Sequence, residues 1–339
     1  MVLFDDIGSY PPPDAITREK MQEFFKDFER NRAHLSQHIQ DAMRQKISAG
    51  VEVPNYPQFQ DMNQQFLGYI NDPERTEQPF LVREEAARIV ELETLEKVAE
   101  EYKNSKGEKL KVRVCVTGPI ELGYKQFGNG MYVDILLNFA RSVNRFLKKS
   151  LAVGWMNVVA VSIDEPSIGI SPFNLSDDDL ARALDTASQG LSADVQIHLH
   201  SPLHYKLVCP VDGIKIIGLE AAASPSYLQL IDKKDLEAYD KFLRVGIART
   251  DIFRMASEFS EKHKIDIWRN REKFADLINE FESPDTIALR LRKATEIFGE
   301  RIKYVGPDCG LGTWPSQGTA SRLLENTAKG IKSFRGENK

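Results

Sequence analysis

Eight short apolar segments, each of strand length and each ending in a polar or Gly/Pro motif, alternate along this chain with longer segments of helical pattern. They cover residues 3–10, 50–55, 112–119, 158–166, 195–200, 214–220, 243–249 and 302–309. Parallel strands that alternate with helices form either a closed (β/α)8 barrel or an open doubly wound sheet. Eight repeats favour a single (β/α)8 TIM barrel that comprises residues 1–339 as one domain, with the doubly wound sheet as the alternative.

The intervening segments carry the apolar periodicity of helices. Residues 17–48, 84–103 and 131–150 place apolar side chains three and four positions apart. Ser176, followed by three aspartates, has the pattern of a helix N-cap, and further helix starts are predicted at 283–286 and 316–319. The stretches around 60–110 and 250–300 are longer than a single crossover needs, so we expect insertions there.

Composition excludes several classes of protein. The 339 residues carry a net charge of −5, which gives no reason to expect a nucleic-acid partner. No apolar run reaches the length of about 18 residues that a membrane span needs, and the first residues do not resemble a signal peptide. The three cysteines are far apart and odd in number, which argues against a disulfide framework. We therefore expect a cytoplasmic protein.

Imidazole, carboxylate and thiol groups stand at the ends of three predicted strands. His198 and His200 are two positions apart and should point to the same side of their strand. Glu220 ends one apolar run, and Cys309 ends another where the backbone turns at Gly and Pro residues. Each of these residues alone has an ordinary structural explanation, but a barrel brings all strand ends to one rim. Together they predict a Zn²⁺ site with His198, His200, Glu220 and Cys309 as candidate ligands.

Other strand ends supply candidate catalytic and substrate-binding groups. The paired carboxylates of Asp164 and Glu165 could act as acid and base or bind an amino group, although a turn that starts a helix explains them equally well. Thr117 and Ser9 lie in small-residue loops where a backbone can approach a ligand closely. No G-x-G-x-x-G or Walker loop occurs, which argues against a dinucleotide or ATP enzyme.

The ordered set of motifs resembles the catalytic domain of cobalamin-independent methionine synthase. The set comprises Ile7-Gly-Ser9, Thr117-Gly-Pro119, Ile163-Asp-Glu-Pro166, the His198-Leu-His200 pair, Glu220 and Pro307-Asp-Cys-Gly-Leu311. The similarity runs from residue 7 to about 325 and is closest to the short core forms of archaea and some anaerobic bacteria. Coenzyme M methyltransferases and uroporphyrinogen decarboxylases share the barrel.

The resemblance implies roles for individual residues. His198, Glu220 and Cys309 would be zinc ligands, and Ile7, Ser9 and Asp164 would hold the amino-acid part of homocysteine. The implied reaction is attack of a zinc-bound homocysteine thiolate on an activated methyl group, which yields methionine.

Three departures from the family pattern affect this expectation. His200 stands where a cysteine is usual, so a bound ion would carry one less negative charge, or His200 would not ligate at all. Gln58 stands where a substrate-binding glutamate is expected, and it can hydrogen-bond an ammonium group but not neutralise it. The segment after Pro119 lacks the tryptophan of a folate-stacking surface. We therefore expect a methylated corrinoid protein, rather than methyltetrahydrofolate, as the donor.

The same departures leave two alternatives open. One is a related thiol methyltransferase with another acceptor, of the coenzyme M type. The other is a decarboxylase-like or non-catalytic barrel that has lost its metal.

Overall fold

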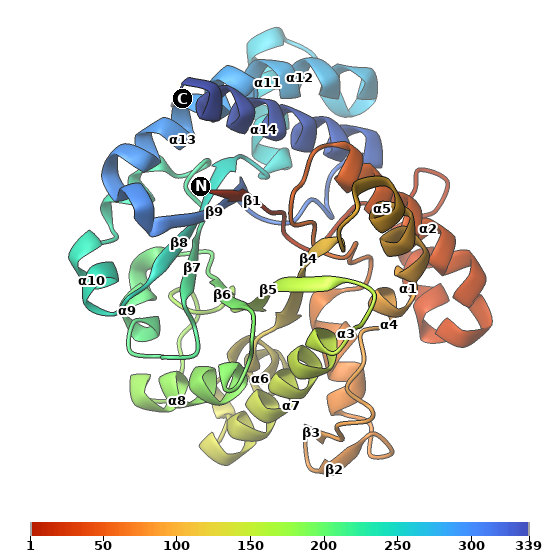
Figure 1. Cartoon of the computed structure of the whole chain (residues 1–339), viewed down its shortest axis with the longest axis vertical. Helices are drawn as coiled ribbons and strands as arrows, with labels where there is room; N and C mark the ends of the chain where they lie inside the picture. Colours follow the sequence, from red (N-terminus) through yellow and green to blue (C-terminus); the bar gives the residue numbers. More distant parts are fainter. Residues whose placement is uncertain (1, 338–339) are drawn as a thin grey trace.

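The computed structural model of this protein describes residues 2–337 and is built around a curled parallel sheet (Figure 1). Within these residues the sheet has seven strands: β1 Leu3–Phe4, β4 Lys111–Thr117, β5 Asn157–Asp164, β6 Asp194–His198, β7 Ile216–Leu219, β8 Phe242–Ala248 and β9 Ile302–Pro307. They coincide with seven of the eight predicted strands. A short antiparallel ribbon, β2 Thr76–Gln78 with β3 Leu81–Val82, lies in the first predicted insertion.

The strand order identifies the sheet as a barrel. Neighbours follow one another as β1-β9-β8-β7-β6-β5-β4, and every pairing is parallel. A doubly wound sheet would reverse its strand order at a switch point. Here the first strand of the chain pairs with the last, as it does when a sheet wraps round on itself. The predicted barrel class is therefore confirmed, and the doubly wound alternative is excluded.

The eighth predicted strand lies in the gap between β1 and β4 without forming a regular strand. Three isolated parallel bridges hold it: Asp5 with Val53, Asn55 with Arg113, and Ser9 with Gln58. Pro54 and Pro57 have no N–H to donate, so a continuous ladder cannot form along this stretch. We call residues 51–58 the seam segment, because they close the barrel.

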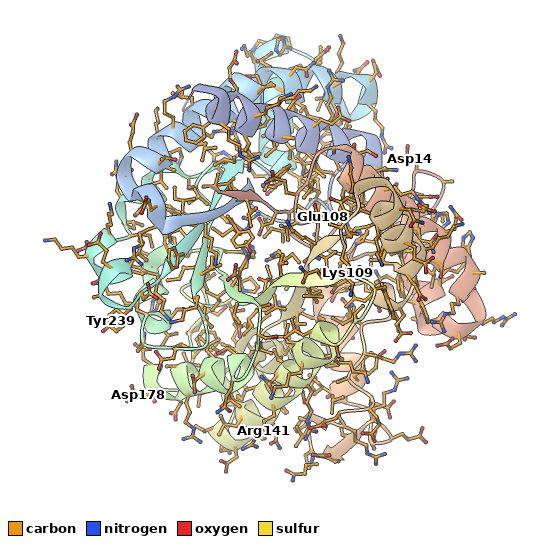
Figure 2. The ribbon with its side chains drawn as sticks, viewed as in Figure 1. Asp14, Glu108, Lys109, Arg141, Asp178 and Tyr239 are labelled. Atoms are coloured by element: carbon orange, nitrogen blue, oxygen red, sulfur yellow. The ribbon has the colours of Figure 1, made fainter. Side chains whose placement is uncertain are left out.

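Helices surround the sheet (Figure 1). Those of the described residues are α1 Arg18–Lys26, α2 Phe28–Ser48, α3 Met62–Ile70, α4 Val90–Glu93, α5 Glu96–Lys106, α6 Pro119–Phe127, α7 Val133–Leu151, α8 Asp177–Ser188, α9 Tyr205–Val208, α10 Lys233–Ala238, α11 Ile252–His263, α12 Phe274–Phe281, α13 Pro284–Phe298 and α14 Gln317–Glu337. Between residues 2 and 337 none of them is long and apolar enough to cross a bilayer. Charged side chains such as Arg141 on α7 and Asp178 on α8 lie at the periphery (Figure 2).

Most helix predictions are confirmed, and two are corrected. Residues 131–150 form α7, and the Ser176 hydroxyl caps α8 by accepting a hydrogen bond from the Asp179 N–H at 3.2 Å. Residues 17–48 form two helices instead of one, because Asp27 leaves the helical conformation and caps α2. Residues 84–103 become helical only from Val90, because the chain turns where the Arg83 carbonyl accepts two backbone N–H groups.

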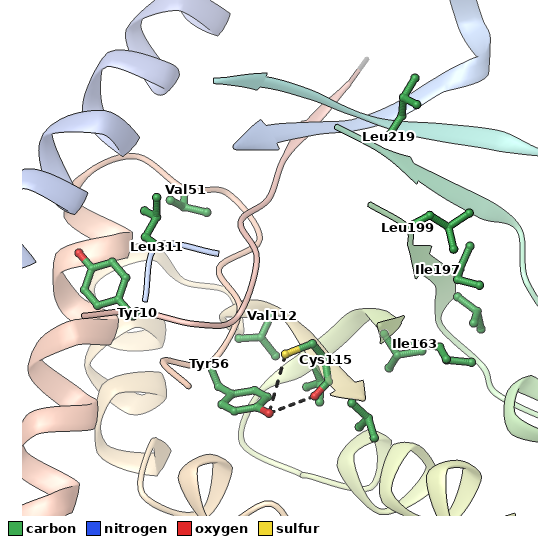
Figure 3. Close-up of a cluster of buried hydrophobic side chains, with 14 of the residues drawn as sticks. Tyr10, Val51, Tyr56, Val112, Cys115, Ile163, Ile197, Leu199, Leu219 and Leu311 are labelled. Atoms are coloured by element: carbon green, nitrogen blue, oxygen red, sulfur yellow. Dashed lines mark hydrogen bonds between the residues drawn. The ribbon is translucent and has the colours of Figure 1, made fainter. Parts of the chain in front are cut away.

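The core combines apolar packing with a buried polar layer inside the barrel. Ile163 and Ile197 are register partners on β5 and β6 and belong to the apolar cluster of Figure 3. In the polar layer, Asp5 accepts a hydrogen bond from Arg244 Nε at 2.8 Å. The guanidinium of Arg113, also fully buried, has one nitrogen 3.8 Å from Oδ1 of Asp164. This layer therefore places positive charge directly beneath a candidate site residue.

Candidate metal centre at the C-terminal face of the barrel

Four side chains from three strand ends form one cluster. They are His198, His200, Glu220 and Cys309, and each offers a ligand atom within 4.8 Å of the others. His198 is the last residue of β6, Glu220 directly follows β7, and Cys309 lies two residues beyond β9. Because parallel strands end at the same face of a barrel, residues far apart in sequence meet there. The structure thus brings together all four predicted metal ligands.

The separations between these atoms suit a zinc ion. The Cys309 sulfur lies 3.5 Å from Nε2 of His198 and 3.7 Å from Nε2 of His200. Oε1 of Glu220 lies 3.4 Å and 3.6 Å from the same two nitrogens. Tetrahedral zinc, with bonds of about 2.0–2.3 Å, separates its nitrogen, oxygen and sulfur ligands by about 3.3–3.6 Å. The donor set and its spacing therefore fit Zn²⁺.

Burial disfavours the charged form of every side chain in the cluster. It raises the pKa of the Cys309 thiol well above its usual range and raises the pKa of the Glu220 carboxyl group. It lowers the pKa of His198 to about 4, and it also lowers the pKa of His200. Oε1 of Glu220 is buried without a hydrogen-bond partner in the described residues. Such an atom is costly unless something compensates it, which a cation bound between these donors would do.

The cluster opens into a cavity of about 670 Å³. Eight of the ten candidate residues line it: Ile7, Ser9, Gln58, Asp164, His198, His200, Glu220 and Cys309. Oδ1 of Asp164 accepts a hydrogen bond from the Ser162 hydroxyl at 2.6 Å, which fixes its carboxylate. The Ser9 hydroxyl accepts from the Gly312 N–H at 3.3 Å, so its own proton remains available to a ligand. The cavity can therefore hold a small molecule against the metal donors.

Glu165 and Thr117 do not line the cavity. Both carboxylate oxygens of Glu165 accept backbone N–H groups at the start of α6, from Ile120 at 2.9 Å and from Glu121 at 2.7 Å. Burial raises its pKa well above the usual range. A Cβ at Gly118 would collide with this carboxylate, which explains the glycine of the Thr-Gly-Pro motif. Thr117 donates its hydroxyl to the Met62 carbonyl at 2.7 Å.

Asp308 is a site residue that the sequence interpretation missed. Its carboxylate accepts the backbone N–H groups of Ala222 at 2.9 Å and Ala223 at 2.7 Å. It therefore ties the loop after β9, which carries Cys309, to the loop after β7, which carries Glu220. Burial raises its pKa to about 8. Its place beside Cys309 in the Pro-Asp-Cys motif was the available signal.

Curated relatives carry one common name. The chain matches no established family model. It is 23% identical over 333 residues to a methionine synthase of Methanothermobacter thermautotrophicus, covering 94% of this chain and 96% of that protein. It is 24% identical over 232 residues to a methionine synthase of Sulfolobus acidocaldarius, but this match covers 67% of this chain and only 57% of that protein.

Solved structures agree on the fold. A B12-independent methionine synthase from Shewanella sp. W3-18-1, in complex with selenomethionine, superimposes with a TM-score of 0.63 at 15% identity. The match covers 100% of this chain and 99% of that one. These names confirm the prediction of a methyltransferase-type enzyme. The resemblance identified from the motifs is confirmed with them: the chain is similar over nearly its whole length to an archaeal protein named methionine synthase, and it has the fold of a B12-independent methionine synthase.

Proposed function

We propose that this chain is a zinc-dependent methyltransferase that transfers a methyl group to a small thiol, with homocysteine as the acceptor and methionine as the product. The observation that carries the proposal is the cluster of His198, Glu220 and Cys309, with His200 beside them, in the wall of the cavity. Zinc bound there would supply a thiolate at neutral pH, the nucleophile that methyl transfer needs.

The cavity residues suit an amino-acid thiol. The Asp164 carboxylate would attract an ammonium group by charge, and the Gln58 side chain would accept a hydrogen bond from it. The Ser9 hydroxyl and the backbone around Ile7 would hold the carboxylate end. Because Glu165 caps α6 outside the cavity lining, we assign it no proton transfer, and Thr117 no direct substrate contact.

A methylated corrinoid protein is the donor that we favour over methyltetrahydrofolate. The segment after Thr117-Gly-Pro119 continues as Ile-Glu-Leu-Gly and offers no indole for stacking. Within the described residues, the cavity lining contains no tryptophan either. We also keep the expectation of a cytoplasmic protein, on the ground of its three separate free cysteines.

Metal content and acceptor choice test the proposal together. Protein purified without chelator should contain about one zinc per chain, and Cys309→Ser should lose most of it while keeping its circular dichroism spectrum. The zinc-loaded protein should form methionine from homocysteine and methylcobalamin, measured by mass spectrometry. Coenzyme M and methyltetrahydrofolate serve as the competing acceptor and donor.

Each competing result replaces a specific part of the proposal. Methylation of coenzyme M but not homocysteine would indicate a different thiol acceptor on the same metal. Transfer from methyltetrahydrofolate alone would remove the corrinoid donor. A folded protein that takes up no zinc would favour the decarboxylase-like or non-catalytic alternative.

A further inference from the structure

A line of side-chain hydrogen bonds runs from a fully buried carboxylate to the cavity wall. Oε2 of Glu91, on α4, accepts a hydrogen bond from Nε2 of Gln65, on α3, at 3.2 Å. Oε1 of Gln65 accepts from Nε2 of Gln58, in the seam segment, at 2.7 Å. Gln60 Nε2 donates to the other oxygen of Glu91 at 2.7 Å. All of Glu91, Gln65 and Gln58 are buried, and Gln58 lines the cavity.

The carboxylate gives this line a fixed direction. A glutamine side chain can present either its oxygen or its nitrogen to a neighbour, so an isolated amide chain has no preferred polarity. An ionised carboxylate can only accept. Gln65 must therefore turn its nitrogen to Glu91 and its oxygen to Gln58, and Gln58 must turn its nitrogen to Gln65. The consequence is that Gln58 keeps its oxygen for another partner.

That oxygen has a weak partner in the protein. The Cys115 thiol lies 3.9 Å from Oε1 of Gln58, a long contact even for sulfur. The backbone of Gln58 is held by hydrogen bonds to the carbonyl of Gly8 at 3.0 Å and from the N–H of Tyr10 at 3.2 Å. Both the position and the orientation of this acceptor are thus determined before a ligand arrives, which spares the cost of ordering it.

We propose that Glu91 is a positioning residue that fixes Gln58 as a hydrogen-bond acceptor for the amino group of the substrate, and that the site thereby selects amino thiols over thiols without an amino group. This inference rests on the proposed function, since it concerns the thiol acceptor of the same site. Glu91 itself touches no substrate. Above about pH 7, where this carboxyl group is ionised, its negative charge acts through two amides, whose dipoles align and reinforce one another in the low-dielectric interior.

The environment of Glu91 supports a functional reason for its presence. Its side-chain hydrogen-bond partners within the described residues are amides, with no Lys or Arg among them. Burial raises its pKa to about 7. A buried carboxylate without a cationic partner lowers stability, so an apolar or amide side chain would serve packing better. An ammonium group at Gln58 would supply the missing positive charge.

Binding of two matched thiols tests the inference. Homocysteine and 4-mercaptobutanoate share the thiol, the carboxylate and the carbon chain, but only homocysteine has an amino group. Calorimetry on zinc-loaded protein should find that Glu91→Gln weakens homocysteine binding about 10-fold or more, as expected for a hydrogen bond to a charged group. Binding of 4-mercaptobutanoate and zinc stoichiometry should not change. Glu93→Gln, a charge change on the same helix outside the line, is the matched control.

A reversal experiment tests whether an acceptor-only group at either end of the line supports binding of the amino group. The double variant combines Gln58→Glu with Glu91→Gln, so the carboxylate lies at position 58 and the amide at position 91. Each hydrogen bond along the line can then form with its donor and acceptor exchanged. We expect this double variant to regain most of the homocysteine affinity that Glu91→Gln loses. Equal weakening of both thiols in Glu91→Gln, or no weakening at all, would overturn the role of Glu91.

The wild-type protein distinguishes failure of this inference from failure of the proposed function. If it binds both thiols equally well, amino-group selection is overturned while the zinc–thiol chemistry stands. If it binds neither thiol, the proposed function is overturned and the inference with it.

Discussion

His198 and His200 approach the same Cys309 sulfur, at 3.5 Å and 3.7 Å, from very different environments. The side chain of His198 is 4% exposed and that of His200 is 39% exposed. Catalytic zinc commonly has three protein ligands and one open position. The exposed imidazole is therefore the one that water or a thiol could most easily replace.

The two histidines should differ in their effect on zinc binding. We expect His198→Ala to abolish stoichiometric zinc at micromolar metal. His200→Ala should keep one zinc per chain with an affinity lowered about 10- to 100-fold, the range seen when a supporting rather than an essential group is lost. Competition with a chromogenic chelator measures both constants. Equal loss in the two variants would make His200 a full ligand, and no loss in His200→Ala would remove it from the site.

Glu165 should contribute to the stability of the fold and not to metal binding. Glu165→Ala leaves the N–H groups of Ile120 and Glu121 buried without an acceptor, which costs about 1–3 kcal/mol for each group. Urea unfolding should show the loss, while zinc stoichiometry stays at the wild-type value. Gly118→Ala, which forces a methyl group against the same carboxylate, should destabilise in the same direction. A stable Glu165→Ala protein with impaired methyl transfer would restore a catalytic role.

Asp308 should support the geometry of the metal ligands. In Asp308→Asn, one acceptor oxygen becomes an NH2 group that faces a backbone N–H of Ala222 or Ala223. We expect zinc affinity to fall about 10- to 100-fold, as for other groups that orient ligands. Isothermal titration with zinc measures this change. Asp251→Asn, which changes another carboxylate of the cavity lining, is the control.

Glu91 should make the protein less stable as pH rises. Folding raises its pKa from the usual 4.5 to about 7, so the folded state binds its proton more tightly than the unfolded state. The contribution of the protonated Glu91 carboxyl group to the free energy of unfolding is therefore fully present below pH 4.5. It is lost as the pH rises from about 4.5 to 7. At 1.36 kcal/mol for each pKa unit, the loss is about 3 kcal/mol at most.

Glu91→Gln cannot titrate and should escape this loss. Its free energy of unfolding should exceed that of the wild type at pH 8 and match it near pH 4, because contributions from other groups cancel in the difference. Urea titrations at both pH values measure this. A stability difference that does not change with pH would show that Glu91 keeps an ordinary pKa in the folded protein.

The metal ligands could be predicted because their signals are local. Each of His198, Glu220 and Cys309 follows an apolar run, and the barrel brings the ends of such runs together. The structure separates the pair Asp164-Glu165: Asp164 lines the cavity, whereas Glu165 accepts the N–H groups at the start of α6. Neighbouring residues along a strand face opposite sides, so only one of the two carboxylates could reach the cavity.

The line from Glu91 to Gln58 could not be predicted in the same way. Gln65 on α3 and Glu91 on α4 are 26 residues apart, and neither residue ends one of the strand-like apolar runs. Their contact depends on how α3 and α4 pack, which no periodicity in the sequence specifies. The seam segment is a related case: its composition suggested a strand, but its prolines allow only isolated bridges.

The seam segment has a thermodynamic consequence. Around the rest of the barrel each strand is joined to its neighbours by two or more successive residue pairs, whereas here single bridges carry the closure, so this should be where the sheet opens first. One of those bridges joins Ser9 to Gln58, and both residues line the cavity. A ligand that contacts both residues would hold the two segments together across the opening. A bound ligand would then hold the barrel closed and slow the amide hydrogen exchange of residues 51–58. Substrate binding and closure of the barrel would therefore be linked in one equilibrium, so the exchange rate would report occupancy of the cavity.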